Sequence, residues 1–386
     1  MADAQVGARF GLRLAWVTVF SVVGIMCFAE MAGRVALKTQ RPALGLARSR
    51  LGPRYALFGL VGSLLVTGLL VMAELSGIAL ALQLATSVHY LLWVPVAALL
   101  VLLVVVTLPF EAMERLYGLL GLTMLVFVVA VWQLGPDWSA LAQSAATLSP
   151  TAGETWATYA FFVVTLIGAQ MTPYEMFFFS SGAVESRWRP KDLGEMRFNV
   201  IIGFPLGGLL ALAIQAVAFL VFFDRGVTVE HISQTALPVA VALGKVGLVI
   251  AIVGIFAATF GATLETLFAS GYEVAQYFGW PYGKIQPLAR AARFTTVILV
   301  LLLAATALAL TTIDPITVTI IAVVFSAALL PFLFLPVLLV ANDRELMGDL
   351  VNGRLANTIG TTVLLLTILV SVAAFPLLVL TRGGVS

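Results

Sequence analysis

Charged side chains are scarce in this chain, and histidine and cysteine are scarcer still. Of its 386 residues, 10% are charged and 61% are hydrophobic, with two histidines and a single cysteine. Soluble domains carry about 25% charged residues, so the composition excludes a soluble globular protein and predicts an integral membrane protein. The lone Cys27 cannot form an internal disulfide bond. The short alternating segments of outer-membrane barrels are absent, which leaves an all-α polytopic membrane protein.

The sequence also lacks the motifs of an enzyme. It contains no His and Cys cluster with metal-binding spacing, no P-loop and no defensible Ser/His/Asp arrangement. We therefore predict a protein that is not an enzyme and that uses no cofactor. The basic residues fall in short loops between apolar runs, as membrane topology requires, so they do not indicate nucleic-acid binding.

Apolar runs of about 20 residues recur along the whole chain, as helices that cross a ~30 Å hydrocarbon core require. They predict ten transmembrane helices, at residues 12–33, 55–84, 91–109, 116–134, 157–183, 198–223, 239–278, 294–312, 317–340 and 358–380. Sixteen Lys and Arg residues fall in alternate loops, beginning with 34–54, and five fall on the other side. The positive-inside rule places the sixteen in the cytoplasm and the N-terminus outside. One further helix upstream of Met1 would restore the more usual internal N-terminus, although proteins with an external N-terminus exist.

A polar interruption, Gly168-Ala-Gln-Met-Thr-Pro-Tyr-Glu175, divides the fifth apolar run. Pro173 removes a backbone donor and clashes with the preceding turn. Gln170, Thr172 and Glu175 place polar groups at membrane depth, where each needs a partner. Many carriers build ion or substrate sites from helices broken in this way. A proline kink packed by neighbouring helices would show the same pattern, so the residues alone leave both interpretations open.

Three other intramembrane carboxylates and one glycine motif stand out. Glu30 lies four residues before Arg34, and we expect a simple ion pair. Glu74 lies mid-span with no charge near it in sequence, which indicates a functional residue. Glu265 is expected either to face a cavity or to pair with another helix. Gly203-Phe-Pro-Leu-Gly207 is a G-x-x-x-G motif, and we expect it to allow close helix packing within the bundle.

Several segments of the chain together resemble the NRAMP superfamily of divalent-metal transporters. They are similar to parts of that family's second, third, sixth and tenth helices, and the sixth is a broken helix in the family. The resemblance covers nearly the whole chain. The segments that carry it are Val6–Trp16, Glu30–Arg34, Ala73–Leu80, Gly168–Ser181, Leu330–Pro336 and Glu345–Gly348.

The resemblance implies a LeuT-type fold of two inverted five-helix repeats, in which helices one and six break at mid-membrane around the ion. The ten spans would be family helices two to eleven, with the first family helix missing. Residues 1–386 would form a single transporter domain, with 1–156 as the remainder of the first repeat, 157–340 as the second, and 358–380 as an extra C-terminal helix. The family's first helix carries an Asp-Pro-Gly-Asn-like motif that supplies metal ligands, and this chain begins near its tail. A mis-assigned start codon and a truncated, inactive protein both fit.

The ion site implied by the resemblance departs from the family pattern. Members that carry manganese or iron have Met before the Pro and His after it, whereas this chain has Thr172 and Tyr174. A hydroxyl is a hard ligand that favours Mg²⁺, Ca²⁺ or Mn²⁺, and a related branch with this kind of substitution transports magnesium. The expected ligands are backbone carbonyls near Ala169, the Thr172 hydroxyl, Gln170 through a water molecule, and Glu175.

The resulting prediction is a secondary transporter that moves a divalent metal cation by alternating access, with Mg²⁺ the first candidate and Mn²⁺ the second. Met171 is assigned to packing, and the family's helix-ten Gln is absent, with Val323 nearest in register. Glu74 matches a position on the family's proton route, but the His that would partner it is Tyr174 here. Glu74, Glu265 and Tyr174 are candidates for a proton path or for gating. The loss of the His leaves a second interpretation open, in which Glu74 only holds the bundle together through hydrogen bonds.

Two other functions stay open at this point. One is a LeuT-fold carrier of an organic solute such as an amino acid, and the other is a truncated homologue that does not transport. The expected partners are the divalent ion and the lipid bilayer, with no nucleic acid, and the oligomeric state is not specified by the sequence. The expected location is the bacterial plasma (inner) membrane.

Overall fold

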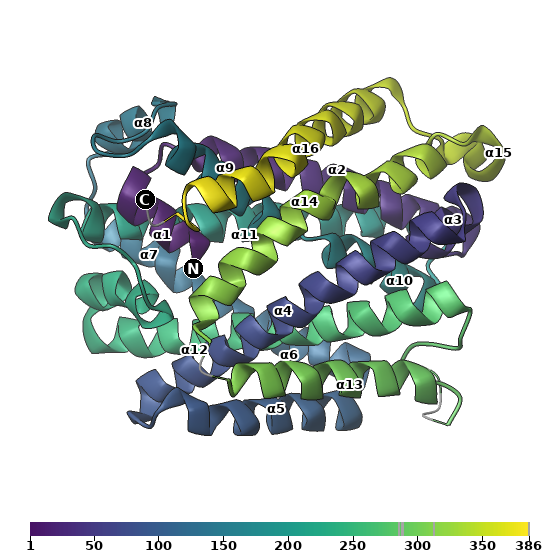
Figure 1. Cartoon of the computed structure of the whole chain (residues 1–386), viewed down its shortest axis with the longest axis horizontal. Helices are drawn as coiled ribbons and strands as arrows, with labels where there is room; N and C mark the ends of the chain where they lie inside the picture. Colours follow the sequence, from purple (N-terminus) through teal and green to yellow (C-terminus); the bar gives the residue numbers. More distant parts are fainter. Residues whose placement is uncertain (285, 287–288, 312, 385–386) are drawn as a thin grey trace.

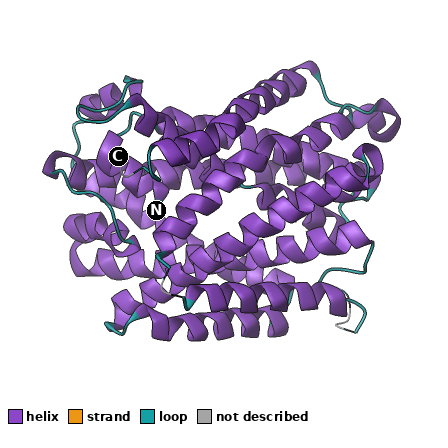
Figure 2. Ribbon diagram, in the orientation of Figure 1, coloured by secondary structure: helices purple, strands orange, loops and turns teal. Residues whose placement is uncertain are grey.

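The fold is a bundle of helices. The computed structural model describes residues 1–284, 286, 289–311 and 313–384, without the side chains of residues 110, 111, 114, 116, 117 and 232. The described part of the chain contains helices and loops and no strand (Figure 2). Within that part, nine helices are long and apolar enough to span a membrane, or ten if a bent helix pair counts as one more span. The prediction of an all-α polytopic protein is therefore confirmed.

The helices match the predicted spans to within a few residues. The bent pair contains the predicted fourth span, which is divided between two short helices and a 3₁₀ turn before the chain bends by 111° into α8. The predicted fifth span is divided at its polar interruption. The helices are α1 (Ala2–Phe10), α2 (Ala15–Thr39), α3 (Ala43–Leu51), α4 (Pro53–Thr86), α5 (Tyr90–Thr107), α6 (Phe110–Gly121), α7 (Val126–Gln133), α8 (Trp138–Ala146), α9 (Trp156–Gln170), α10 (Pro173–Glu185), α11 (Leu193–Phe222), α12 (Leu237–Phe278), α13 (Ala292–Ala309), α14 (Pro315–Ala341), α15 (Arg344–Met347) and α16 (Arg354–Leu380).

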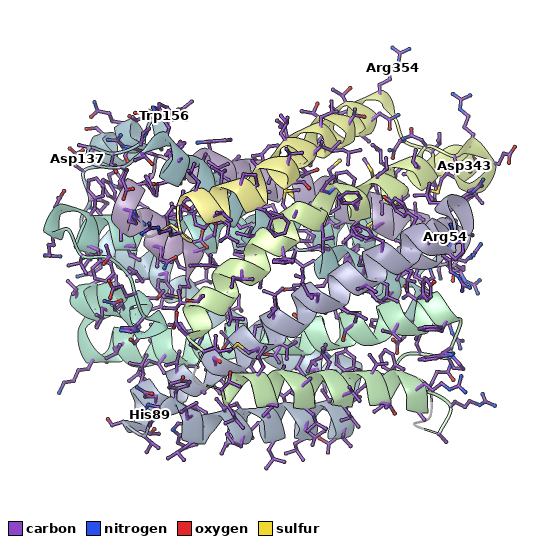
Figure 3. The ribbon with its side chains drawn as sticks, in the orientation of Figure 1. Arg54, His89, Asp137, Trp156, Asp343 and Arg354 are labelled. Atoms are coloured by element: carbon purple, nitrogen blue, oxygen red, sulfur yellow. The ribbon has the colours of Figure 1, made fainter. Side chains whose placement is uncertain are left out.

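The helix ends gather at two opposite ends of the molecule. Figure 3 shows Arg54 and Arg354 at one end and His89 and Trp156 at the other. We call these the Arg54 end and the His89 end. The short helices α3 and α15 lie at the Arg54 end (Figure 1), where the sequence predicts the basic cytoplasmic loops. Glu111 and Glu114 lie close to Arg115 in sequence, which predicts structural salt bridges, but both carboxylate side chains are outside the described residues.

The short helix α1 was not among the predicted spans. It packs along α11 and against α9, and its last residue, Phe10, meets Tyr159 of α9 edge to face with ring centroids 5.8 Å apart. Gly11 then adopts φ 60°, a left-handed conformation that glycine tolerates best, and the chain turns into α2. The first residues of the chain are thus held inside the bundle, beside the break between α9 and α10. That a further family helix is missing before them stays a prediction.

Candidate metal site

The polar interruption is a true break between two half-helices. α9 ends at Gln170, and Met171 leaves helical geometry with φ −122° and ψ 52°. Thr172 is extended, and Pro173 begins α10, where its missing N–H is not needed. The last carbonyls of α9, including that of Ala169, have no partner inside the helix and form the negative end of its dipole. The break therefore offers backbone oxygens to a cation at membrane depth.

The break is supported from behind by α14. A Cβ atom added at Gly168 would lie 1.9 Å from the Val323 carbonyl oxygen, so only glycine allows the two backbones to approach this closely. Val323 is also the residue that the sequence places nearest to the family's helix-ten Gln. The structure therefore places an apolar side chain, and no amide, at this point beside the break.

Met171 is turned away from the ion path. Its side chain is fully buried, and its sulfur would lie 3.2 Å from a Cβ added at Gly24 of α2. Val363 of α16 packs around the same glycine. The thioether thus fills a gap between helices, as expected of a flexible core residue.

A cavity of about 660 Å³ leads from the break toward the Arg54 end. Gln170, Glu175 and Glu265 line its inner part, and Trp188 and Asn199 line the part nearer to the Arg54 end. Glu265, on α12, is exposed to this cavity, whereas Glu175 is partly buried. Carboxylates along such a cavity concentrate cations near the break.

The glycine motif of α11 borders the same cavity, contrary to the close helix packing expected from its spacing. No described atom comes within 4 Å of a Cβ added at Gly203 or Gly207, and both residues line the cavity. The expected close helix packing at these positions is therefore wrong. The close approach occurs one residue later, where a Cβ on Gly208 would lie 2.5 Å from Val22 of α2. The two glycines of the motif instead widen the cavity.

Four hydrogen-bonded side chains, which we call the Asp3 cluster, adjoin the break, and one of them, Gln170, lines this cavity. Its members are Asp3 of α1, Thr18 of α2, Gln170 of α9 and Gln215 of α11. The Gln170 amide nitrogen donates to Asp3 Oδ1 at 3.0 Å and to Thr18 Oγ1 at 3.2 Å. The Gln215 amide nitrogen donates to the same two oxygens, at 2.9 Å each. Both donors of each amide are thus directed at one carboxylate and one hydroxyl.

Sequence reasoning found only Gln170 among these four residues. Gln215 is an amide inside an otherwise apolar span, a signal of the same kind as Glu74. Asp3 lies before the first predicted span, so its depth is visible only once α1 is placed. Three buried oxygens at the break have no hydrogen-bond partner among the described residues, namely Gln170 Oε1, Gln215 Oε1 and Thr172 Oγ1.

The other predicted residues gather near the break. Glu74 of α4 accepts a hydrogen bond from Thr266 of α12 at 3.2 Å, and its second oxygen has no partner within the described part of the chain. Tyr174 is buried and lies close enough to Glu74, Glu175 and Glu265 to interact electrostatically. Among the described residues, no group of three or more His, Cys, Asp or Glu side chains is arranged to hold a metal ion. A cation here would therefore depend on amide, hydroxyl and carbonyl oxygens as well.

The His89 end is closed over the break. Arg9 of α1 forms an ion pair with Glu154 at 2.7 Å and donates to the Gly384 carbonyl, while Thr151 donates to the Arg9 carbonyl at 3.0 Å. A separate cavity of about 1100 Å³ lies at this end, lined by Gln5 among others. The two cavities share no lining residue, so the break is reached from the Arg54 end.

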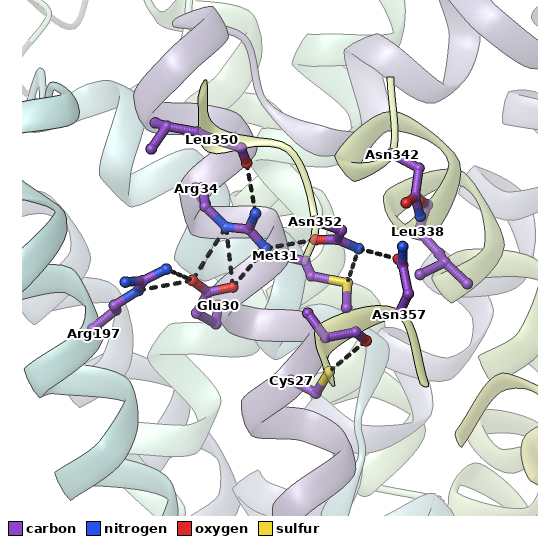
Figure 4. Close-up of polar contacts among 11 residues, drawn as sticks. Cys27, Glu30, Met31, Arg34, Arg197, Leu338, Asn342, Leu350, Asn352 and Asn357 are labelled. Carbon is purple, nitrogen blue, oxygen red and sulfur yellow. Dashed lines mark hydrogen bonds and ion pairs between the residues drawn. The ribbon is translucent and has the colours of Figure 1, made fainter. Parts of the chain in front are cut away.

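A second polar group, the Arg34 cluster, is centred on Arg34 and Glu30 of α2 (Figure 4). The Arg34 guanidinium holds both oxygens of Glu30 at 2.9–3.2 Å and donates to the Leu350 carbonyl and to Asn352 Oδ1 at 2.6 Å each. Arg197 of α11 adds an ion pair to Glu30 at 2.9 Å. The predicted pair between Glu30 and Arg34 is confirmed as part of a tie between α2, α11 and the loop before α16.

Comparison with known proteins decides the family. A profile of the Nramp family, described as natural resistance-associated macrophage protein-like, matches residues 1–376. The chain belongs to the Nramp family. It is 25% identical over 376 residues to a divalent metal cation transporter MntH of Pectobacterium carotovorum, covering 95% of this chain and 87% of that one. It is equally identical, at 25% over 376 residues, to the MntH of Deinococcus radiodurans, covering 94% and 82%.

Solved structures agree on the fold. An Eremococcus coleocola manganese transporter superposes with a TM-score of 0.67 at 20% identity, over 96% of this Nramp chain and 81% of that one. Mhp1, a nucleobase-cation-symport-1 family transporter, superposes with a TM-score of 0.58 at 13% identity, over 97% and 88%. The LeuT-type fold is therefore confirmed, and the chain is an integral membrane transporter related to divalent-metal carriers. Such proteins are transporters and not enzymes.

Proposed function

We propose that this Nramp protein carries a hard divalent cation by alternating access, with Mn²⁺ the first candidate and Mg²⁺ the second. The observation that carries the proposal is the chemistry of the break. Gln170 and Glu175 line the cavity, the buried Thr172 hydroxyl oxygen has no partner among the described residues, and the sulfur of Met171 packs against Gly24. Hard oxygen ligands favour such ions. The order of the two ions is the reverse of the one expected from sequence, because a solved structure of similar fold is that of a manganese transporter.

In this proposal, the cation binds at the ends of α9 and α10. The Ala169 carbonyl, the Gln170 side chain and the Thr172 hydroxyl act as ligands directly or through water, and Glu175 supplies negative charge. Mg²⁺ and hydrated Mn²⁺ both tolerate a ligand set with few side chains, because bound water completes their coordination. The described conformation opens toward the Arg54 end, which the positive-inside rule assigns to the cytoplasm of a bacterial inner membrane.

Glu74, Glu265 and Tyr174 are the proposed coupling or gating residues. Glu74 has one oxygen without a partner among the described residues and lies near Glu265, which faces the cavity. A buried carboxylate in this position can exchange a proton as the ion passes. With a pH-sensitive dye inside reconstituted vesicles, we expect Mn²⁺ uptake to acidify the lumen and Glu74→Gln to uncouple the two fluxes. Mn²⁺ uptake without any proton movement in the unmodified protein would exclude this role.

The proposed substrate is tested by flux into proteoliposomes that contain the full chain. We expect uptake of Mn²⁺, and of Mg²⁺ at higher concentration, with weak uptake of Cd²⁺. Uptake of Cd²⁺ or Fe²⁺ without Mn²⁺ or Mg²⁺ would contradict a hard-cation site. Uptake of an amino acid without any metal would instead support an organic-solute carrier, and the absence of all transport would support a non-transporting homologue.

A further inference from the structure

The Asp3 cluster contains more acceptors than its own donors can satisfy. The two amide nitrogens of Gln170 and Gln215 serve Asp3 Oδ1 and Thr18 Oγ1, and both amide oxygens remain without a partner among the described residues. Gln215 is fully buried, and Thr172, with its own unpartnered hydroxyl oxygen, is 4% exposed. Buried acceptors normally find a donor. A cation satisfies several such oxygens together.

The cluster also lies where an ion has to pass. Gln170 lines the cavity that opens toward the Arg54 end. On α1, Gln5 and Ala8 follow Asp3 and line the separate cavity at the His89 end. A rise of about 1.5 Å per helical residue places Ala8 only ~7.5 Å beyond Asp3 along the axis. The Asp3 cluster therefore lies between residues that line the two cavities, and we call it the partition between them.

We propose that Asp3 and Gln215 are direct ligands of the transported cation, supplied by α1 and α11 to complete the site at the break. This inference rests on the proposed function and extends its ligand set. In the described conformation, the amide nitrogens of Gln170 and Gln215 donate to the Asp3 carboxylate. When a divalent cation enters, both amides turn over, so that their oxygens and the carboxylate face the ion. The same exchange releases the hydrogen bonds that join α1, α2, α9 and α11 across the partition.

A purely structural role for the cluster makes different predictions, which two nearly isosteric substitutions separate. Asp3→Asn keeps an oxygen that can accept both amide bonds but removes the negative charge. Hydrogen bonding within a purely structural cluster is preserved by this change, whereas a bound cation loses its anionic ligand and keeps only a neutral amide oxygen, which binds it more weakly. Gln215→Glu keeps the shape of the side chain and adds a negative charge beside Asp3. Without a cation the two carboxylates repel each other, whereas a bound divalent ion is favoured by the second charge.

The experiment is calorimetric titration of the purified full-length protein with MnCl₂ at pH 8, with flux measured on the same variants. We expect Asp3→Asn to weaken Mn²⁺ binding at least tenfold and Gln215→Glu to strengthen it severalfold. Gln276→Glu is the matched control, because Gln276 is also a buried amide with an unpartnered oxygen but donates only to Ser181. We expect its affinity for Mn²⁺ to stay within twofold of the unmodified protein.

Each outcome decides the matter. Binding within twofold of normal in Asp3→Asn, with Mn²⁺ transport intact, overturns this inference and leaves the proposed function standing. If Asp3→Asn does not fold, then Gln215→Glu decides, since unchanged or weaker binding overturns the inference. An unmodified protein that neither binds nor carries Mn²⁺ or Mg²⁺ overturns the proposed function itself.

Discussion

The Asp3 cluster and the Arg34 cluster are both polar and both join α2 to α11, but they differ in how fully their hydrogen-bonding groups are paired. In the Arg34 cluster, no buried side-chain nitrogen or oxygen of the described residues lacks a partner. Arg34 donates to Glu30, Leu350 and Asn352, and Asn352 donates in turn to Asn357 at 2.9 Å (Figure 4). In the Asp3 cluster, the amide oxygens of Gln170 and Gln215 have no hydrogen-bond partner among the described residues.

The difference separates a structural tie from a binding site. A buried polar network that is fully satisfied rigidifies the structure and has no reason to admit a ligand. A network with surplus acceptors is stabilised when a cation arrives. The two clusters also differ in charge, because an arginine neutralises Glu30 whereas no described Lys or Arg bonds to Asp3. We therefore expect substitutions in the Arg34 cluster to change stability, and substitutions at the break to change ion binding.

The largest expected effect is on stability, from Arg34→Leu. The Arg34 side chain is 5% exposed, so its removal leaves Glu30 and Asn352 partly buried without their main partner, which costs roughly 3 kcal/mol. We expect a marked fall in the detergent melting temperature, measured by the fluorescence of the protein, and Mn²⁺ affinity within twofold of normal for the folded fraction. Arg34→Lys should recover part of the loss. An unchanged melting temperature, or a tenfold loss of Mn²⁺ binding, would erase the distinction between the clusters.

The next largest effect is expected from Gly168→Ala, at the contact of α9 with α14 behind the break. The added methyl group would lie 1.9 Å from the Val323 carbonyl oxygen, so α9 and α14 have to separate, and overpacking of this kind costs about 2 kcal/mol. Because the displaced segment carries Gln170 and Thr172, we expect both the melting temperature and Mn²⁺ affinity to fall.

The matched control for this change is Gly203→Ala on α11. No described atom lies within 4 Å of its added Cβ, and alanine is favoured over glycine in a helix. We expect no loss of stability. Equal destabilisation by the two substitutions would show that the contact between α9 and α14 is not what supports the site.

A smaller effect is expected on ion choice, from Thr172→Met. The substitution places a soft thioether where a hydroxyl lies, so Cd²⁺ should gain about tenfold over Mn²⁺ in competition uptake, which corresponds to ~1.4 kcal/mol. Thr172→Val is the control that removes the hydroxyl without adding sulfur. An equal gain of Cd²⁺ in both variants, or in neither, would mean that residue 172 does not select the metal.

The sequence predicted the parts of this structure whose signals are local. Each of these signals lies within one stretch of the chain. They are the apolar runs, the break at Gly168–Glu175 and the pairing of Glu30 with Arg34, and the structure contains them. The family resemblance placed Val323 nearest in register to the helix-ten Gln, but its contact with Gly168 was not predicted.

The missed features depend on which helices meet. Asp3 and Gln215 are 212 residues apart, and no periodicity indicates that one amide would face one carboxylate. The glycine motif of α11 was assigned to packing because its spacing permits a helix contact, yet the cavity lies where the partner helix was expected. Spacing indicates what a helix face permits, whereas tertiary packing decides whether that face is used.

The smallest expected effect on stability is that of Arg197→Ala. Arg197 is the most exposed member of the Arg34 cluster. Arg197 pairs with Glu30 at 2.9 Å, but its side chain is 48% exposed, and exposed ion pairs contribute about 0.5 kcal/mol. Glu30 keeps Arg34 as its partner, so no buried charge is left alone. We expect a shift in melting temperature far smaller than that of Arg34→Leu, reduced further at high salt. Arg50→Ala removes the exposed ion pair with Asp343, and we expect a similarly small shift in melting temperature. If Arg197→Ala instead matched Arg34→Leu, the cluster would act as one cooperative unit, and burial would not decide which of its bonds matter.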